Sequence, residues 1–185
     1  MTEDAPVFTT ARLLLRPFKA EECEAVHAVL DCDEEVWRFD PGHAPSLEER
    51  RDKIARYAAL WTQFGAGPAG AWCRETGALI GQGGPSPYLY EHRDGSQTVE
   101  FEVMYKLARR FWGLGYATEM ARFWVDHCFN VLKLRRLCIG PERANTRSVA
   151  VLERLGARVS DDWLEPESVL GIIENPSVAQ REVLP

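Results

Sequence analysis

A strand-like run that leads through a glycine-bearing turn into an amphipathic helix is the most constraining feature of this chain. The run covers residues 98–107, and the turn reads Arg110-Phe-Trp-Gly113-Leu-Gly115-Tyr-Ala-Thr118. Glycines have no Cβ, so backbone N–H groups can close on phosphate oxygens, and a helix N-terminus adds partial positive charge. The segment therefore predicts a cradle for a phosphorylated cofactor.

The two common nucleotide-binding motifs do not match this turn. A dinucleotide fingerprint has the form G-x-G-x-x-G, whereas Thr118 stands here at the third glycine position. A P-loop ends in Gly-Lys-Ser/Thr, which the chain lacks. Taken alone, the turn is equally compatible with a structural link between a strand and a helix.

Size and composition indicate an ordinary globular domain. The chain has 185 residues, of which 45% are hydrophobic and 27% charged, so we expect one domain over 1–185 with its core in 9–174. A net charge of −6 argues against a nucleic-acid partner. No apolar run is long enough to span a bilayer, and the N-terminus lacks the pattern of a signal peptide. We therefore expect a cytoplasmic protein without a membrane partner.

The cysteines and histidines show no metal-ligand spacing. The cysteines are odd in number and scattered, and none forms a C-x-x-C pair: they are Cys23, Cys32, Cys73, Cys128 and Cys138. The four histidines are not spaced with them as ligands would be. This pattern predicts reduced thiols and no metal site.

Periodicity and turn signals predict a mixed α/β (α+β) sheet, not an alternating doubly wound one. We expect strands at 9–17, 70–74, 78–83, 98–107, 136–139, 157–159 and 169–173, and helices at 20–30, 46–64, 117–128 and 145–156. Ser46 and Glu49 have the spacing of a capping box. Residues 85–96 are polar and contain proline and glycine, which predicts a loop.

A second notable segment lies about thirty residues beyond the turn. It reads Asn145-Thr-Arg-Ser148 and continues to Leu155-Gly156. Asn145 is a good N-cap, and Ser148 falls at the third helical position. Helix capping alone explains both residues without any function.

Together, these segments resemble the GNAT N-acetyltransferase superfamily. The resemblance rests on Arg110-x-x-Gly-x-Gly115 with Tyr-Ala-Thr-Glu119, on Asn145-x-x-Ser148 with Leu-Gly156, on Thr10-Ala-Arg12-Leu-Leu-Leu-Arg16-Pro-Phe, and on Glu75-Thr-Gly77-Ala-Leu-Ile-Gly81. The last two segments look like those of the ribosomal-protein N-terminal (alanine) acetyltransferase branch (RimJ/RimL-like). The resemblance covers about residues 9–159, and the tail 161–185 matches less well. It implies the acyl-CoA N-acyltransferase fold, a mostly antiparallel sheet flanked by helices, in which the fourth and fifth strands splay apart.

The resemblance also implies acetyl-CoA as the donor and a set of residues that bind it. The pantetheine arm would pair with the backbone of Tyr105, Lys106 and Leu107. The diphosphate would lie on the turn, in contact with Arg110, Gly113, Leu114, Gly115, Tyr116 and Ala117. Asn145 would contact the pantetheine arm. Ser148 would lie near the sulfur, where many members of the superfamily place a tyrosine as general acid.

Glu100 and Glu102 are the candidate general bases. They lie two residues apart on the predicted strand 98–107, so they share one face. A carboxylate there can take the proton of the attacking amine, directly or through water; the alternative is that both side chains are solvated on an outer face. A base matters less for an α-amine, with a pKa of about 8, than for a lysine-type amine at about 10.4. For Glu119 we expect a structural role.

The sequence thus predicts an enzyme that transfers an acetyl group to a primary amine by direct attack within a ternary complex. The acceptor stays open. The branch resemblance favours a protein N-terminal α-amine, and a small amine such as a polyamine, amino acid or antibiotic is the second option. A non-catalytic acyl-CoA-binding module is the alternative from another functional class. The oligomeric state is open too, with a homodimer as one option.

Overall fold

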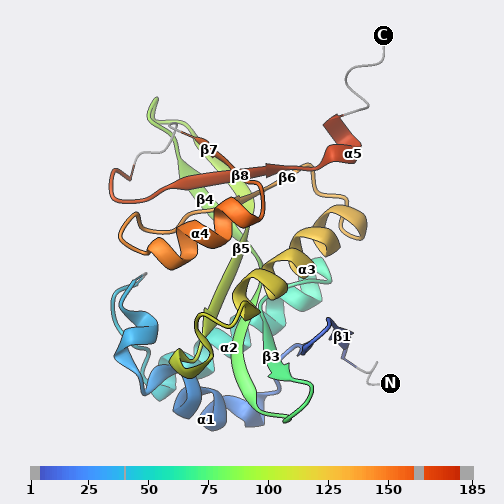
Figure 1. The fold of residues 1–185 in the computed structure, drawn as a ribbon, viewed down its shortest axis with the longest axis vertical. Helices are drawn as coiled ribbons and strands as arrows, with labels where there is room; N and C mark the ends of the chain where they lie inside the picture. Colours follow the sequence, from blue (N-terminus) through green and yellow to red (C-terminus); the bar gives the residue numbers. More distant parts are fainter. Residues whose placement is uncertain (1–4, 40, 161–164, 180–185) are drawn as a thin grey trace. The chain divides into compact units, whose positions relative to one another are not determined.

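A computed structural model describes residues 5–39, 41–160 and 165–179 of the chain. Figure 1 shows the arrangement of its helices and strands. The strands are β1 (Phe8–Thr9), β2 (Leu13–Arg16), β3 (Ala69–Cys73), β4 (Leu79–Glu91), β5 (Gln97–Leu107), β6 (Arg136–Ile139), β7 (Arg158–Ser160) and β8 (Leu170–Glu174). The α-helices are α1 (Cys23–Val26), α2 (Leu47–Phe64), α3 (Tyr116–Asn130), α4 (Thr146–Arg154) and α5 (Pro176–Ala179). Short helical turns are η1 (Ala20–Glu22), η2 (His27–Asp31), η3 (Glu34–Trp37) and η4 (Arg109–Phe111). Of the tail that resembled the family less well, residues 161–164 and 180–185 lie outside the described residues.

Backbone hydrogen bonds join the strands of the described part of the chain into one sheet of eight. The strand order is β1-β2-β3-β4-β5-β6-β8-β7. The pairs β1–β2, β2–β3, β3–β4, β6–β8 and β7–β8 are antiparallel. The pair β5–β6 is parallel, with Glu102 opposite Cys138. This mixed, mostly antiparallel sheet confirms the predicted fold class.

The chain divides into two compact units. The first comprises Met1–Gly84 and Met104–Met120, and the second comprises Pro85–Val103 and Ala121–Pro185. The elements β4, β5 and α3 each continue from one unit into the other. The single domain expected over 1–185, with a core in 9–174, stays a prediction.

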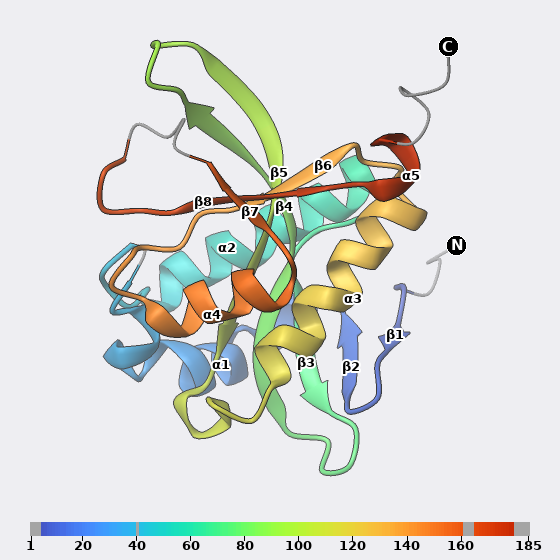
Figure 2. The ribbon, with the colours of Figure 1, turned by 45° about the horizontal axis from the view of Figure 1, so that its top comes forward.

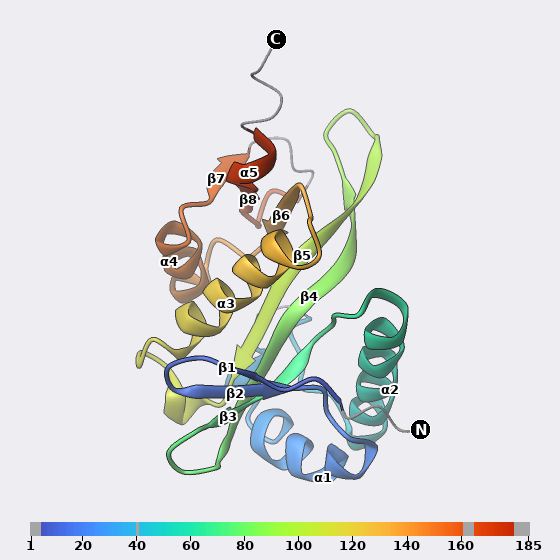
Figure 3. The ribbon, with the colours of Figure 1, turned by 90° about the vertical axis from the view of Figure 1, so that its right-hand side faces the viewer.

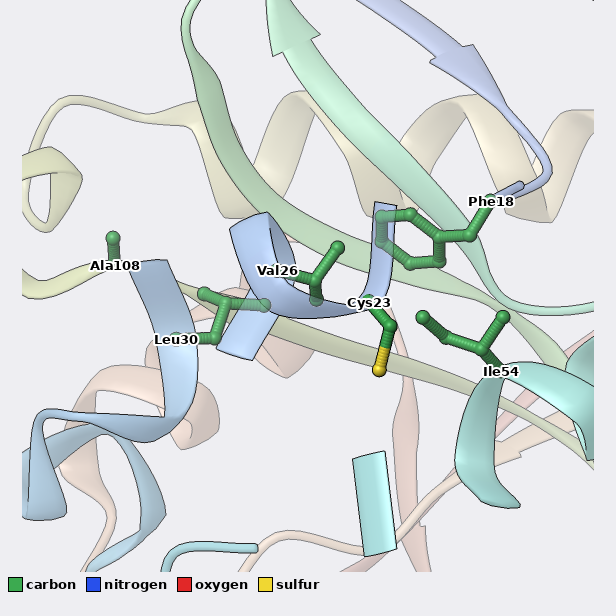
Figure 4. Packing of buried hydrophobic residues seen from close by; sticks show 6 residues of the cluster. All are labelled: Phe18, Cys23, Val26, Leu30, Ile54 and Ala108. Carbon is green, nitrogen blue, oxygen red and sulfur yellow. The ribbon is translucent and has the colours of Figure 1, made fainter. Parts of the chain in front are cut away.

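The first unit has its own hydrophobic core beside β2 and β3. Figure 3 shows α1 and α2 next to each other beside these strands. The buried cluster, drawn in Figure 4, consists of Phe18, Cys23, Val26, Leu30, Ile54 and Ala108. Burying each of its large aliphatic side chains contributes roughly 1.5–3 kcal/mol to folding. Ala108 belongs to this cluster and directly follows β5, so the core fixes the point where the glycine turn begins.

Helix α2 begins and ends as the sequence predicts, and its buried face includes a charged residue. Ser46 and Glu49 form the capping box, with the Glu49 N–H donating to Ser46 Oγ at 3.3 Å and the Ser46 N–H donating to Glu49 Oε2 at 2.7 Å. Gly65 ends the helix in the left-handed region, at φ 67°. Arg50 is completely buried, whereas the apolar Phe64 at the end of the helix is 37% exposed. The ion pair with Asp31, which a hydrophobic periodicity does not register, explains the burial of Arg50.

The loop predicted for residues 85–96 is wrong over most of its length. Strand β4 continues to Glu91 through Pro85 and Pro87, and β5 begins at Gln97. The turn is confined to the hairpin tip, where the His92 N–H donates to the Ser96 carbonyl at 2.8 Å. Figure 2 shows the two strands continuing side by side to this tip. Proline lacks a backbone N–H, so it removes one hydrogen-bond donor from a strand. Where that N–H would have no acceptor on a neighbouring strand, the strand can continue through the proline.

The second unit is built on β6, β8 and β7 with α4. Tyr90, Cys138 and Leu170 form its buried cluster. Gly171 on β8 lies so close to α4 that an added Cβ would come within 2.2 Å of a Leu152 methyl carbon. The five cysteines are free in the structure, and all except Cys32 are buried. Among the described residues, no helix combines the length and apolar character that crossing a bilayer requires.

Candidate active site

The glycine turn lies entirely in the first unit, between β5 and α3. Gly113 has φ 75° and Gly115 has φ 82°, a backbone region that residues with a Cβ rarely adopt, so both positions require glycine. The first hydrogen bond of α3 runs from the Glu119 N–H to the Gly115 carbonyl at 3.1 Å. The amides of the three preceding residues therefore have no carbonyl partner four residues back. The turn can offer these amides to an anion.

The surface of the turn is open. Arg110, Gly113, Leu114 and Gly115 are exposed, whereas Tyr116 and Ala117 are half-buried. No heavy atom outside its chain neighbours lies within 4 Å of a Cβ built on Gly113. The Arg110 guanidinium lies 4.9 Å from the centroid of the Phe111 ring, a cation–π contact that holds positive charge beside the turn.

The strand residues predicted to meet pantetheine differ in their side-chain surroundings. Leu107 is buried, and its carbonyl accepts a hydrogen bond from Trp112 Nε1 at 2.7 Å. Tyr105 and Lys106 are half-buried. Lys106 Nζ lies 4.4 Å from the Trp37 ring centroid and donates to the Phe39 carbonyl at 3.4 Å.

Trp37 is a core residue. Its side chain is 2% exposed, and its Nε1 donates to the Leu30 carbonyl at 2.9 Å. The segment around it is also attached to the start of the turn. Arg109 Nε lies 3.0 Å from Asp33 Oδ2. The stretch from Asp33 to Phe39 is thus joined to β5 and to η4.

Arg12, whose sequence context indicates only an opening strand, contacts the turn directly. Its Nε donates to Glu119 Oε2 at 2.7 Å, and its Nη1 donates to the Leu114 carbonyl at 2.8 Å. The guanidinium also stacks 4.2 Å from the Tyr116 ring centroid. Arg12 is separated from Glu119 by 107 positions, so no local pattern reveals the contact.

Glu119 has the structural role expected for it. Its Oε1 accepts hydrogen bonds from Thr10 Oγ1 at 2.5 Å and from the Arg12 N–H at 2.8 Å. Burial raises the pKa of Glu119, but the hydrogen bonds from Thr10 and Arg12 outweigh burial and hold that pKa below its usual value. The carboxylate is therefore ionised at neutral pH and bound on both oxygens.

A hollow of about 430 Å³ adjoins this ion pair. Its lining consists of Ala11, Arg12, Cys73, Arg74, Glu75 and Tyr116. Hydrogen bonds to Thr76 lower the pKa of the Cys73 thiol, whereas burial raises the pKa of Cys128 and of Cys138 to about 12. The charged residues of this lining are Arg12, Arg74 and Glu75, and Arg12 is already paired with Glu119.

Glu100 and Glu102, the predicted bases, lie on β5 within the second unit, and both are half-buried. Glu100 Oε1 accepts a charged hydrogen bond from Arg136 Nη2, and this hydrogen bond raises the pKa of Arg136. Burial raises the pKa of the Tyr90 hydroxyl, and the negative charge of Glu102 makes a second, smaller contribution in the same direction. Glu100 is thus committed to an ion pair, and Glu102 acts electrostatically on its surroundings.

Asn145 and Ser148 are joined by the capping bond that the sequence predicts. The Ser148 N–H donates to Asn145 Oδ1 at 3.2 Å at the start of α4, and both residues are half-buried. Gly156, at φ 73°, follows the helix in the left-handed region. The roles of Asn145 toward pantetheine and of Ser148 toward sulfur stay predictions. Among the described residues, no three His, Cys, Asp or Glu side chains are grouped so as to hold a metal ion.

Comparison with known proteins identifies the family to which this geometry belongs. The family model of the acetyltransferase (GNAT) domain matches residues 12–158. The chain belongs to the GNAT acetyltransferase family. Its relatives include the protein YkkB of Bacillus subtilis (strain 168), which is 30% identical over 168 residues, 86% of this chain and 91% of YkkB.

Solved GNAT structures have the same fold as this chain. An acetyltransferase from Agrobacterium tumefaciens matches with a TM-score of 0.76 and 26% identity, covering 94% of this chain and 97% of that one. An acetyltransferase from Salmonella typhimurium that modifies the N-terminal serine of the 50S ribosomal protein L7/L12 matches with a TM-score of 0.70 and 16% identity, covering 91% and 99%. At that identity, the second match bears on the fold alone.

Membership of the GNAT family makes this protein an acetyl-CoA-dependent acetyltransferase, which confirms the predicted enzyme class and donor. The first unit has the features that a diphosphate needs: glycines without Cβ, amides at a helix N-terminus, and Arg109 and Arg110 beside them. The turn therefore fits the donor.

Proposed function

We propose that this GNAT enzyme acetylates protein N-terminal α-amines, as its resemblance to the ribosomal-protein branch favours. The observation that carries this proposal is the ion pair between Glu100 and Arg136. Because Glu100 is held by a cation, it is poorly suited to take a proton, and Glu102 becomes the proposed base. A site with a single modest base is suited to an acceptor that is already partly neutral.

The pKa of the acceptor decides how much help it needs. At pH 7 an α-amine with a pKa of about 8 is roughly one-tenth neutral, whereas a lysine-type amine with a pKa of about 10.4 is neutral in about one molecule in 2,500. That difference of about 2.4 pKa units corresponds to about 3.3 kcal/mol. A general base typically contributes about 10²- to 10⁴-fold, so a weakly assisted site favours the α-amine. The segment Thr10 to Phe18, which looks like the opening strand of the branch, supports the same acceptor.

The other residues receive roles that follow from their chemistry. When bound, acetyl-CoA supplies a thioester that the neutral amine attacks. The turn from Arg110 to Ala117 would hold the diphosphate through its amides, and the backbone of β5 at Tyr105–Leu107 would orient the pantetheine arm. Asn145 would contact that arm. Ser148 would offer its hydroxyl proton to the departing thiolate, which needs little help because the thiol pKa is about 8.5.

An acceptor panel tests the proposal. Acetyl transfer is followed by release of the CoA thiol and by mass spectrometry of the product. The panel contains peptides with free N-termini, the same peptides N-terminally blocked but carrying lysine, a polyamine, free amino acids and an aminoglycoside. We expect kcat/KM to be at least tenfold higher for free N-termini. A preference for the polyamine, the amino acids or the antibiotic would select the small-amine alternative instead.

Ser148→Ala tests the proposed proton donor. This substitution keeps the backbone N–H that Asn145 caps, so the helix start is preserved. We expect kcat to fall about tenfold, which is below the usual range for a general acid because the leaving thiol is acidic. CoA affinity measured by calorimetry should stay within twofold of wild type. An equal loss of kcat and affinity would reduce Ser148 to a capping residue.

A further inference from the structure

The side chain of Arg12, in the β1–β2 connection, contacts both the glycine turn and the start of α3. The connection is a tight turn, in which the Thr10 N–H donates to the Leu13 carbonyl at 2.9 Å. From there, the Arg12 guanidinium binds the Glu119 carboxylate and the Leu114 carbonyl and stacks on Tyr116. All of these residues belong to the first unit.

We propose that Arg12 is a positioning residue that sets the glycine turn in the conformation that binds the diphosphate of the donor. The proposal rests on the proposed function in one respect, namely that the diphosphate lies on this turn. Arg12 acts through the turn and through Glu119, and it is not itself assigned as a ligand of the donor.

The first step of the argument concerns the peptide group between Leu114 and Gly115. In a planar trans peptide, the C=O and the following N–H point in opposite directions. Arg12 Nη1 holds the Leu114 carbonyl at 2.8 Å, so the Gly115 N–H is directed away from Arg12. Glycine reaches the φ of 82° found at residue 115 without a Cβ clash, so the backbone there can adopt this orientation and the Arg12 hydrogen bond holds it. Arg12 thus aims an amide of the turn.

The second step concerns charge. Glu119 stands in the first turn of α3, where a carboxylate would repel a bound diphosphate. Arg12 Nε lies 2.7 Å from Glu119 Oε2, and the Arg12 N–H and Thr10 Oγ1 occupy the other oxygen. The Glu119 side chain is 18% exposed, so water screens it only partly. Arg12 therefore cancels a negative charge that would otherwise oppose binding.

The third step concerns space. A Cβ built on Gly115 would lie 3.4 Å from Arg12 Nη2. This is ordinary van der Waals contact, so the guanidinium packs against position 115, and the requirement for glycine there comes from the backbone conformation. Lysine has no planar fork, so it cannot contact Glu119 and Leu114 with the same geometry.

The test separates the diphosphate from the rest of the donor. Binding of CoA and of ADP is measured by calorimetry, and binding of pantetheine, which lacks the diphosphate, by ligand-observed NMR. We expect Arg12→Gln to weaken binding of CoA and ADP at least tenfold and to leave binding of pantetheine within twofold. Arg12→Lys, which retains the charge and serves if Arg12→Gln does not fold, should weaken CoA binding by a smaller factor that is still above twofold. In Arg12→Gln/Glu119→Gln, part of the lost CoA affinity should return because the uncompensated carboxylate is gone.

Arg16→Gln is the matched control. Arg16 forms an ion pair with Glu22 at 2.5 Å and stacks 3.8 Å from the Trp72 ring centroid, so it has the same kind of contacts without touching the turn. This variant should bind all three ligands as wild type does. An equal loss of CoA and pantetheine binding in Arg12→Gln would overturn the proposal, as would unchanged CoA binding in folded Arg12→Gln. If Arg12→Gln folds and binds CoA normally, weakened CoA binding by Gly113→Val would still support the turn as the diphosphate site. If Arg12→Gln and Gly113→Val both bind CoA normally, the placement of the diphosphate on the turn would be refuted as well.

Discussion

Replacing Arg50 by methionine should destabilise the first unit strongly. The Arg50 and Asp31 side chains are both completely buried. Arg50 Nε and Nη2 donate to the two Asp31 oxygens at 2.7 and 2.5 Å, and Nη1 donates to Gln82 Oε1 at 2.7 Å. In Arg50→Met, Asp31 would remain buried, and among its described side-chain interactions only the contact with the His27 ring, at 3.1 Å, would be left.

The magnitude follows from this burial. Breaking a buried ion pair by removing one partner typically costs about 3–5 kcal/mol, because the remaining charge is left uncompensated. In a chain of this size, 1 kcal/mol shifts Tm by about 2–4 °C, so Tm should fall by roughly 6–20 °C. A native state is stable by only about 5–15 kcal/mol, and the loss is a large part of that total.

The assay is urea unfolding followed by circular dichroism, with two comparison variants. In Arg50→Met/Asp31→Leu both charges are gone, and stability should return to within about 2 kcal/mol of wild type because a well-packed apolar pair replaces the ion pair. Arg51, next to Arg50 in the sequence, forms an ion pair with Glu24 on the surface, where the Arg51 and Glu24 side chains are 56% and 72% exposed. Arg51→Met should therefore change the free energy of unfolding by less than about 0.5 kcal/mol. A loss below about 1 kcal/mol in Arg50→Met, or a double variant no more stable than the single one, would refute the reasoning.

Two further predictions concern the turn and the pH dependence of stability. Gly113→Val should lower the free energy of unfolding by about 1–2 kcal/mol, because residue 113 has a φ of 75°, and should lower CoA affinity at least tenfold. The control is Gly95→Val in the hairpin tip, where φ is 81°; it should cost similar stability without changing CoA affinity. A loss of CoA affinity in both variants would contradict the assignment of the turn. Burial lowers the pKa of His127 below 6.5, so the unfolded chain binds a proton at this residue more readily than the folded chain does. The wild-type protein should therefore lose stability relative to His127→Gln as the pH falls from about 6.5 through the lowered pKa. Urea unfolding of both proteins between pH 7.5 and 5 measures this, and a constant difference across that range would contradict it.

Features that depend on a few neighbouring residues could be predicted from the sequence. Gly113 and Gly115 were singled out for backbone reasons, and both have positive φ. The capping box at Ser46 and the cap at Asn145 are present with their hydrogen bonds. Strand β6 has the predicted bounds, Arg136–Ile139. In each case the determining interactions lie within a few positions of one another, so the local sequence contains the information.

Features that depend on distant partners could not be predicted in the same way. Arg50 on the buried face of α2 contradicts an apolar periodicity, because its partners lie 19 positions earlier, at Asp31, and 32 positions later, at Gln82. Pro85 and Pro87 gave a local turn signal that pairing along β4 overrode. The contact of Arg12 with the turn joins residues more than a hundred positions apart. The pairing of Glu100 with Arg136, on which the proposal of Glu102 as the base depends, likewise became visible only in the structure.

Side-chain contacts solve a problem that an anion-binding turn poses. Amides that bind an anion cannot also bind carbonyls of their own turn, so such a turn has few internal hydrogen bonds to hold its shape. Its order must come from contacts made by its carbonyls and side chains. In the first unit, Arg12 binds the Leu114 carbonyl, Trp112 binds the Leu107 carbonyl, and Arg109 pairs with Asp33. These contacts leave the amides of the turn available while restricting its backbone, so the affinity of the turn for a diphosphate should depend on residues that never touch the diphosphate.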